Sequence, residues 1–568
     1  MPAKDNTPTV NQVEIKIDGS DLPNKIMDEL FEVEVETSLY LPSMFTLRFH
    51  DKTLELIDAT NFSAGKPVEI KLSNSQRVLT SVFKGEITAI EPEFTEAFMG
   101  ELVIRGYDKG HRLNRGTKSR VFKQSTDSDI VQKIAGEVGL SIQADATSEV
   151  HEHVFQYAVN DWGFIHERAR RNNFEVSVED SKLYFRKAPT SSPTVTLIWG
   201  TTMRRFQPRM SLSKQADTVK VRGWDPKKKQ SILGQATSSS SSPTTGIGNW
   251  GGPLSKSAFS KAAEVLEIRH PVRSQKEADT MAQAILDEIN AGFLEAEGIA
   301  FGNPDLKAGI KVKIEKVGTK FSGNYVVTTA RHIYNYKGYD THFTVQGARA
   351  QTISDLVDQS ITEQRTGQLW GGIVPALVTN NVDPENMARV KVKFPWLHED
   401  LESNWARVSG IGAGATRGFL WLPEVNDEVL VAFEHGDFDY PYVVGAVWNG
   451  KDAMPETTSV AVANGKVAVR TLKTTAGHII RLTDTNGSEK IEIIGAKTSS
   501  KITMDEAAKK ITMESGGDIE LKATGNLTLS GVNVTVDASG NLEAKANGTG
   551  KVESTGPLTV KGAVVNIN

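Results

Sequence analysis

The last 120 residues of this 568-residue chain contain no aromatic side chain, because Trp448 is the final Phe, Tyr or Trp. A globular core of that length ordinarily uses aromatic residues for bulk. Low aromatic content would fit disorder, but this segment alternates apolar and polar residues, which predicts strands with one buried face. The alternating pairs are Ile491/Ile493, Ile502/Met504, Ile511/Met513, Ile519/Leu521, Leu527/Leu529, Val534/Val536, Leu542/Ala544 and Leu558/Val560.

The spacing of these pairs predicts a β-helix. From Ile491 to Leu542 their first members recur at steps of 11, 9, 8, 8, 7 and 8 residues, which favours one strand and one tight turn per rung over a hairpin meander. Because each rung has only two small apolar side chains, we expect three chains to wind together around them. A single-chain solenoid or an adhesin stalk is the alternative. The expected trimer core consists of Ile519, Leu521, Leu527, Leu529, Val534, Val536, Leu542, Leu558 and Val560.

Composition excludes several classes of site. The chain has no cysteine, so it has no disulfide, catalytic thiolate or cysteine zinc site. Its first residues lack the apolar core of a secretory signal, and no apolar run is long enough for a membrane helix. Without such a signal, the three glycosylation-like triplets at Asn526, Asn533 and Asn547 are expected to be turn residues and exposed strand threonines.

Residues 366–450 predict a small OB-like barrel of five or six strands. Many OB barrels bind single-stranded nucleic acid through basic grooves, but residues 367–450 carry five Lys or Arg against eleven Asp or Glu, so we expect no nucleic acid. The glycine run Ser409–Gly418 precedes a strand and lacks GxGxxG spacing, which indicates a structural loop. The predicted strands are 371–379, 388–394, 405–409, 418–423, 428–433 and 442–448.

Residues 1–365 predict strands interrupted by three helices. Capping signals begin these helices at Thr126, Asn160 and Ser274. The serine-rich stretch from Ser238 through the following PTTGIGNWGGP predicts a flexible loop. The expected strands are 13–19, 30–49, 66–72, 78–91, 98–107, 195–224, 309–317 and 323–347.

Two polar clusters in this region allow a functional interpretation. Residues 105–123 carry seven Arg or Lys against one Asp, and we favour a solvated face or intersubunit ion pairs over a docking face or channel wall. His151 and His153 could present two imidazoles on one side of a strand, but no third ligand is nearby, so we expect no metal. We also expect no cofactor and no catalytic residue.

Several segments resemble known proteins. RGYDKGHRLNR (105–115), TDSDIVQKIAGEVGL (126–140) and QYAVNDWGFIHERARRNNFEVSVEDSKLYF (156–185) resemble the hub domain of contractile-tail spike proteins. That family includes the valine-glycine repeat protein G (VgrG) of type VI secretion and phage tail hubs. ADTVKVRGWDPKKKQ (216–230) resembles its second barrel, and residues 371–450 resemble the OB domain of phage needles and baseplate assembly proteins. GHIIRLTDTNGSEKIEI (477–493) resembles the start of the needle's triple-stranded β-helix.

The resemblance implies a mainly β fold. Two hub β-barrels with inserted helices would precede an OB-fold barrel and a C-terminal intertwined triple-stranded β-helix, in a homotrimer. We therefore predict a hub domain at 1–365, an OB domain at 366–450, a linker at 451–476 and a β-helix needle at 477–568. The linker is too short for the lysozyme domain that some phage needles insert, and the last residues contain no His for an iron-binding tip.

The implied function is that of a non-enzymatic central spike of a contractile injection system. The chain would be made in the bacterial cytoplasm without a signal peptide and assembled into an extracellular or phage-tail-like particle. It would join a hexameric inner tube and baseplate proteins to a PAAR-like tip protein and contact the target membrane transiently while puncturing the envelope. The expected tip-binding residues are Val564, Val565, Asn566, Ile567 and Asn568.

Other functions stay open. A type VI secretion spike that also carries effectors is the nearest alternative. A β-helical tailspike depolymerase or an adhesin is more remote, since a depolymerase needs paired carboxylates and usually aromatic sugar platforms.

Overall fold

A computed structural model describes residues 12–94, 100–188, 192–240, 244–345 and 371–567. The chain divides into two compact units, Met1–Asn449 and Gly450–Asn568, and each is described by itself. The first unit holds the hub and the small barrel, and the second holds the aromatic-free segment. None of the described helices combines the length and apolar character needed to cross a membrane.

The first half of the hub is an antiparallel array of strands around a core of its own. Apolar residues alternate along each strand, as in β5, where Val68, Ile70 and Leu72 are buried. The predicted strand 30–49 is divided into two, because residues 39–43 turn the chain back on itself. The strands are β1 (Val13–Ile17), β2 (Ser20–Asp21), β3 (Leu30–Ser38), β4 (Met44–His50), β5 (Pro67–Ser73), β6 (Leu79–Phe94) and β7 (Gly100–Tyr107), with the short helix α1 (Asn24–Met27).

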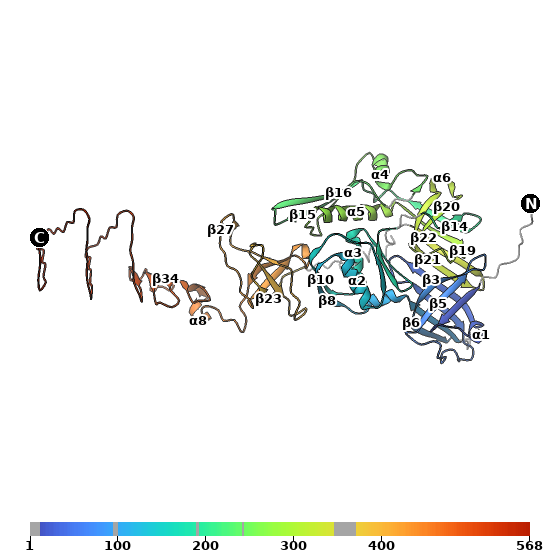
Figure 1. Cartoon of the computed structure of the whole chain (residues 1–568), viewed down its shortest axis with the longest axis horizontal. Coiled ribbons are helices and arrows are strands. Elements are labelled where there is room, and N and C mark those ends of the chain that lie inside the picture. Colours follow the sequence, from blue (N-terminus) through green and yellow to red (C-terminus); the bar gives the residue numbers. More distant parts are fainter. Residues whose placement is uncertain (1–11, 95–99, 189–191, 241–243, 346–370, 568) are drawn as a thin grey trace, which may run out of the picture. The chain divides into compact units, whose positions relative to one another are not determined.

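The second half of the hub has a separate core around Tyr325, Phe293 and Leu306. Strand β21 pairs antiparallel with β3, from Thr329 opposite Ser38 to Asn335 opposite Glu32, so one 14-stranded sheet runs through both halves (Figure 1). Its elements are β13 (Val195–Ile198), β14 (Met203–Met210), β17 (Thr244–Thr245), β19 (Leu294–Phe301), β20 (Lys311–Glu315), α6 (Gly318–Phe321), β21 (Gly323–Asn335) and β22 (Gly338–Val345).

A helical insertion lies between the two halves in sequence. Thr126 caps its first helix with a capping box that includes Asp129, and Asn160 caps its second helix, as the sequence predicts. Both helices bury one face in a shared core. The elements are η1 (Lys109–Asn114), β8 (Lys118–Ser125), α2 (Asp127–Glu137), β9 (Ser141–Ala144), β10 (His151–Val159), α3 (Asp161–Asn172), β11 (Glu175–Glu179) and β12 (Lys182–Arg186).

A second insertion packs the helix α5 along a three-stranded sheet (Figure 1). Ser274 caps α5 through the N–H of Glu277, as predicted. The predicted loop around PTTGIGNWGGP was partly wrong, because helix α4 begins at Gly251. Gly251 lets the side chain of Gln215 approach the backbone closely, because a Cβ atom at position 251 would lie 2.0 Å from Gln215 Oε1. The glycine therefore serves packing and does not confer flexibility. The elements are β15 (Thr218–Asp225), β16 (Gln230–Ala236), α4 (Gly251–Phe259), β18 (Glu264–Glu267) and α5 (Gln275–Ala291).

The small barrel is closed by five strands in the order β23-β24-β25-β29-β28. The predicted strand 418–423 was wrong. Its apolar run, Phe419–Trp421, lies outside any strand, and a separate two-stranded hairpin precedes it. The elements are β23 (Val374–Asn380), β24 (Arg389–Lys393), β25 (Ala406–Val408), β26 (Ala413–Gly414), β27 (Arg417–Gly418), β28 (Glu428–Phe433), η2 (Glu434–Gly436) and β29 (Pro441–Ala446).

The second unit contains a five-stranded antiparallel sheet in which each strand pairs with the next, so our expectation that this segment would form no hairpin meander was wrong for this part. The steps of 11 and 9 residues in this part leave room for five-residue strands and real turns. The first strand of the sheet, β32, lies in the range that we predicted as linker. From residue 515 to 567 the single chain has no helix or strand. The elements are α8 (Thr458–Ala461), β30 (Val462–Ala463), β31 (Lys466–Val467), β32 (Val469–Lys473), β33 (Ile479–Thr483), β34 (Lys490–Ile494), β35 (Lys501–Asp505) and β36 (Lys510–Glu514).

Candidate assembly surfaces

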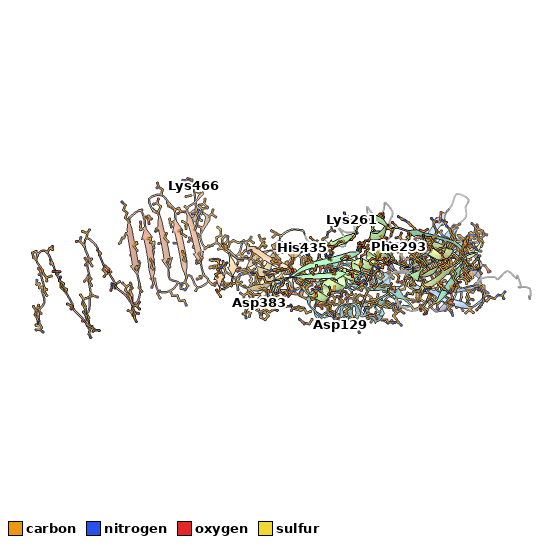
Figure 2. The ribbon with its side chains drawn as sticks, turned by 90° about the horizontal axis from the view of Figure 1, so that it is seen from above. Asp129, Lys261, Phe293, Asp383, His435 and Lys466 are labelled. Carbon is orange, nitrogen blue, oxygen red and sulfur yellow. The ribbon has the colours of Figure 1, made fainter. Side chains whose placement is uncertain are left out.

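One face of the C-terminal sheet is apolar and uncovered. The register places Ile480 opposite Ile493, and Ile493 opposite Ile502, so apolar side chains form continuous rows across the strands. They are 37–65% exposed, although large apolar surfaces are ordinarily buried in soluble proteins. Figure 2 shows side chains projecting from both sides of these strands. The exposed residues are Ile480, Leu482, Ile491, Ile493, Ile502, Met504, Ile511 and Met513.

The opposite face of the same sheet is polar and internally paired. Glu492 is 3% exposed, and its Oε1 lies 2.6 Å from Nζ of Lys501. Burial raises the pKa of Glu492, but the hydrogen bond from Lys501 and the nearby cations outweigh it, so the pKa lies below its usual value. Arg481 bridges Glu492 and Glu456. Glu492 therefore has its charged partners within one chain, whereas the side chains of the apolar face remain exposed.

The predicted trimer-core residues are also uncovered in the single chain. Ile519, Leu521, Leu527, Leu529, Val534, Val536, Leu542, Leu558 and Val560 are 58–71% exposed. The expected tip-binding residues Val564, Val565, Asn566 and Ile567 are exposed as well, and Asn568 lies outside the described residues. One chain by itself therefore buries none of these apolar side chains.

The small barrel is joined to the helical insertion through the loop after β28. Phe438 stacks on Tyr157 with their ring centroids 4.6 Å apart, and Phe155 belongs to the core of the barrel. Asp439 Oδ1 accepts from the N–H of Phe155 at 2.9 Å and lies 3.3 Å from Nδ1 of His153. The sequence contained no local signal for this junction, because its partners lie more than 280 residues apart.

Charged groups surround this junction. Arg171 pairs with Glu167 and lies 3.6 Å from Asp437. Burial raises the pKa of Asp437 to about 6, although the charge of Arg171 opposes the shift. Arg273 pairs with Glu434 and lies over the ring of Tyr440, 4.2 Å from its centroid. Arg171 belongs to the helical insertion and Arg273 to the second insertion, so these contacts join the barrel to both insertions within the first unit.

The basic cluster at 105–123 forms ion pairs within the chain. Lys118 Nζ lies 2.7 Å from Asp161, and Arg120 pairs with both Asp161 and Glu137. Arg105, Arg112 and Lys123 pair with Glu91, Glu86 and Glu402. We expected a solvated face or ion pairs between subunits, whereas the ion pairs that the structure shows for these residues are all within one subunit.

His151 and His153 have separate carboxylate partners. His151 Nε2 lies 3.3 Å from Asp127, which also pairs with the buried Arg168, whereas His153 faces Asp439. Burial raises the pKa of Asp127, but the charge of Arg168 and the hydrogen bond with His151 outweigh it and hold that pKa well below its usual value. Among the described residues, no cluster of three or more His, Asp or Glu side chains is arranged to hold a metal.

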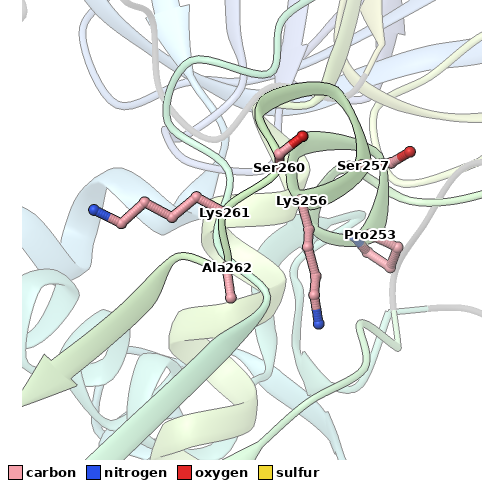
Figure 3. Close-up of a pocket in the computed structure, with 6 residues that line it drawn as sticks. All are labelled: Pro253, Lys256, Ser257, Ser260, Lys261 and Ala262. Atoms are coloured by element: carbon pink, nitrogen blue, oxygen red, sulfur yellow. The ribbon is translucent and has the colours of Figure 1, made fainter.

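The hollow at the end of α4 does not assemble a binding site. It is lined by Pro253, Lys256, Ser257, Ser260, Lys261 and Ala262. Figure 3 shows Lys256 and Lys261 pointing in different directions, so their charges do not converge on one ligand. The hollow also lies at the C-terminal end of a helix, where the helix dipole disfavours anions.

Comparisons with known families match both parts of the first unit. The family model described as "Alg8 N-terminal domain" matches residues 7–335. The model described as "Type VI secretion system/phage-baseplate injector OB domain" matches residues 374–448, which contain all five strands of the closed barrel. The OB-fold predicted from the sequence is therefore confirmed.

Curated relatives are spike proteins. The chain is 26% identical over 202 residues to the type VI secretion system spike protein VgrG1a of Pseudomonas aeruginosa, which covers 33% of this chain and 31% of the relative. It is 36% identical over 75 residues to the spike protein VgrG3 of Vibrio cholerae, or 12% of this chain and 7% of that one. The chain thus spans less than a third of the length of these relatives.

A solved structure, the half-lidded Francisella PdpA-VgrG complex, is similar in fold. Its TM-score is 0.53 at 9% identity, and the alignment covers 89% of this chain and 88% of the other. This likeness concerns the fold alone. Since the Alg8 N-terminal domain model spans more than half of the sequence, the chain belongs to that family, and over the segments that match it is similar to VgrG spike proteins.

Proposed function

We propose that this chain is the non-enzymatic central spike of a contractile injection system and acts as a homotrimer. The uncovered apolar side chains of the second unit carry the proposal. They recur on one face of the sheet and continue at the predicted spacing through residues 515–560, where the single chain forms no strand. Three intertwined copies would bury them on a common axis and would pair the backbone of this segment between chains.

The energetic gain from such burial is large. Each aliphatic side chain transferred from water to a core contributes about 1.5–3 kcal/mol, so the nine predicted core residues of three chains would contribute tens of kcal/mol. That total is an upper bound, because an unfolded chain already buries part of its apolar surface. This gain is large enough to offset the conformational entropy that is lost when a long segment with no core of its own becomes ordered.

The trimer would act mechanically. Its hub would hold the hexameric inner tube and baseplate proteins, and its end, from Val564 to Asn568, would bind a PAAR-like tip protein. Sheath contraction would drive the assembly through the target envelope with only transient membrane contact. A closed β-helix suits this task, since it leaves no long free strand edge along the shaft, and its exposed Lys, Glu and Thr disfavour sticking to lipid.

A type VI secretion spike that also carries effectors is the second candidate. The curated relatives from Pseudomonas aeruginosa and Vibrio cholerae are described as type VI secretion system spike proteins. Fractionation of the producing cells separates the two candidates: particles released into the medium favour the extracellular system, and spike retained with the cell envelope favours type VI secretion.

The first experiment is the absolute mass of the full chain by light scattering on a size-exclusion column. The chain has a mass of 62.0 kDa, and we expect three times that value, retained in mild denaturant. A monomer at every concentration tested would overturn the homotrimer and favour a solenoid that closes within one chain.

A further inference from the structure

The junction between the small barrel and the two insertions brings together more carboxyl groups than cations. Three parts of the first unit meet there: helix α3, the residues at the start of helix α5, and the barrel loop from Glu434 to Tyr442. Two guanidinium groups, those of Arg171 and Arg273, face five carboxyl groups, which we call the carboxyl cluster. Its members are Glu167, Glu277, Glu434, Asp437 and Asp439.

Asp437 is the least compensated member of the carboxyl cluster. It is 9% exposed, and its Oδ2 lies 3.6 Å from Arg171, whose guanidinium also donates to Glu167 at 2.9 Å. Its Oδ1 accepts from the N–H of Asp439 at 3.0 Å, but the carboxylate of Asp439 places a like charge nearby. Burial, a shared cation and a neighbouring like charge together favour the neutral form of a carboxyl group.

The other carboxyl groups of the cluster have closer partners. Each accepts a hydrogen bond from a group that does not also serve Asp437, or forms a tighter ion pair than Asp437 does. These partners are Arg171 for Glu167 at 2.7 Å, the N–H of Arg273 for Glu277 at 3.0 Å, the hydroxyl of Tyr442 for Glu434 at 2.9 Å, and the N–H of Phe155 for Asp439 at 2.9 Å.

The remaining groups around Asp437 do not neutralise it. Burial raises the pKa of Tyr157 and of Tyr440, and the nearby carboxylates raise both pKa values further, so the two phenols stay neutral. The cations near Asp437 other than Arg171 are paired with other carboxylates. These pairs are Arg273 with Glu434, Arg168 with Asp127, and His153 with Asp439.

We propose that this junction is a proton-sensitive lock, in which Asp437 takes up a proton in mild acid and thereby tightens the docking of the small barrel on both insertions. Opening of the junction would return Asp437 to water, where its pKa is 3.8, whereas burial in the docked state raises that pKa to about 6. The docked state therefore holds the proton more tightly than the open state.

The direction of the pH dependence follows from this difference. The stabilisation of the docked state is fully present below pH 3.8 and is lost as the pH rises through about 6. One pKa unit corresponds to a tenfold change in an equilibrium constant, so the equilibrium for docking should increase about tenfold from pH 8 to pH 5. In a spike, the lock would hold the barrel more tightly to the hub in a mildly acidic compartment.

This inference does not rest on the proposed function, because every group of the lock belongs to the first unit of one chain. A chain that proved to be monomeric would lose the homotrimer but keep the lock. Conversely, a trimer whose junction did not respond to pH would lose the lock and keep the homotrimer.

Hydrogen exchange of the full chain measures the lock at the amide of Phe155, which donates to Asp439 across the junction. The protection of this amide is corrected for the intrinsic exchange rate at each pH. It is then divided by the protection of the amides of strand β5, which lie in the first half of the hub. We expect this relative protection to be about tenfold greater at pH 5 than at pH 8. Equal relative protection at both pH values would overturn the lock.

Asp437→Asn tests which group takes up the proton. The amide is neutral at both pH values, so the variant should show at pH 8 the relative protection that the unaltered chain shows at pH 5. Asp400→Asn, at an exposed aspartate of the same barrel, is the matched control and should keep the tenfold difference. A tenfold difference that persists in Asp437→Asn would mean that another group, such as His153, binds the proton, and the assignment to Asp437 would be wrong.

Glu167→Gln tests the shared arginine. The carboxylate of Glu167 raises the pKa of Asp437 and competes with it for Arg171. Its removal should move the midpoint of the pH profile to lower pH, which a general loss of packing would not do. Glu152→Gln, at an exposed position of strand β10, should leave the midpoint unchanged. An unchanged or higher midpoint in Glu167→Gln would contradict the proposed lock.

Discussion

The carboxylate of Asp439 accepts a hydrogen bond from the backbone N–H of Phe155 at 2.9 Å, which ties the small barrel to strand β10 of the helical insertion. The same oxygen lies 3.3 Å from Nδ1 of His153, whose Nε2 contacts the carbonyl of Glu402 at 3.0 Å. One carboxylate thus joins two alternate positions of strand β10, His153 and Phe155, to the barrel.

Replacing Asp439 should loosen this junction. Asp439→Ala leaves the N–H of the buried Phe155 without an acceptor, and an unsatisfied buried donor costs about 1–3 kcal/mol. We expect the free energy of opening at the Phe155 amide, measured by native-state hydrogen exchange, to fall by that amount. Asp439→Asn keeps a carbonyl acceptor and should recover most of the protection. Unaltered exchange in Asp439→Ala would show that the junction does not depend on this bond.

The buried carboxyl of Asp108 should make the hub more stable in mild acid. Burial raises its pKa from 3.8 to about 6, against the hydrogen bonds from the N–H groups of Ser43 and Gly110. The native state therefore holds this proton more tightly than the unfolded state. Protonation of Asp108 adds at most about 3 kcal/mol to the free energy of unfolding. This contribution is fully present below the pKa of Asp108 in the unfolded chain and is lost as the pH rises through about 6.

Asp108→Asn tests this pH dependence. The loss in thermal stability relative to the unaltered chain should be larger at about pH 5 than at about pH 8, since only the unaltered chain gains from protonation. Asp145→Asn is a control at an exposed aspartate. A stability difference that is the same at both pH values would exclude Asp108 as the titrating group.

The ion pair between Lys501 and Glu492 should stabilise the polar face of the C-terminal sheet. Glu492→Gln leaves Lys501 and Arg481 facing a neutral amide, and hydrogen bonds to charged groups contribute about 1.5–3 kcal/mol. We expect faster hydrogen exchange in β34 and β35. Glu514→Gln, on the exposed edge strand β36, should have no comparable effect. If hydrogen exchange in β34 and β35 were equally fast in both variants, the apolar face alone would determine the stability of the sheet.

A charge at Leu527 should prevent trimer formation. Leu527→Asp would bring three carboxylates to a dry axis, where unpaired charges are strongly disfavoured. We expect a chain of monomeric mass by light scattering. Thr528→Asp changes the neighbouring polar position of the same alternating run and should remain trimeric. A folded trimer of Leu527→Asp would refute the intertwined axis.

Removal of residues 560–568 should abolish tip binding but not assembly. The deletion takes away the end of the predicted β-helix, with Val564 and Val565, while most predicted core residues remain. Co-purification with the particle's tip protein should be lost at unchanged trimer mass. Lys561→Ala is the control and should retain the tip protein. Normal retention after the deletion would place the tip contact elsewhere on the spike.

Local signals in the sequence predicted local structure well. Thr126, Asn160 and Ser274 begin helices because a capping side chain bonds to backbone N–H groups within three residues of it. Five strands of the barrel were likewise predicted correctly, from the alternation of apolar and polar residues and from the turn residues between them. The run Phe419–Trp421 misled the strand prediction, because an apolar run does not specify whether a neighbouring strand is available to pair with it.

The sequence by itself determined the mainly β fold, the OB barrel and the apolar positions of the C-terminal segment, because each depends on periodicity and turns within a short stretch of chain. Only the tertiary structure decided that β21 joins β3 across the two halves of the hub and that Asp439 reaches Phe155. Those relationships bring together residues that are distant in the chain, and no local pattern records which distant partner a strand edge, a buried N–H or an apolar side chain will meet.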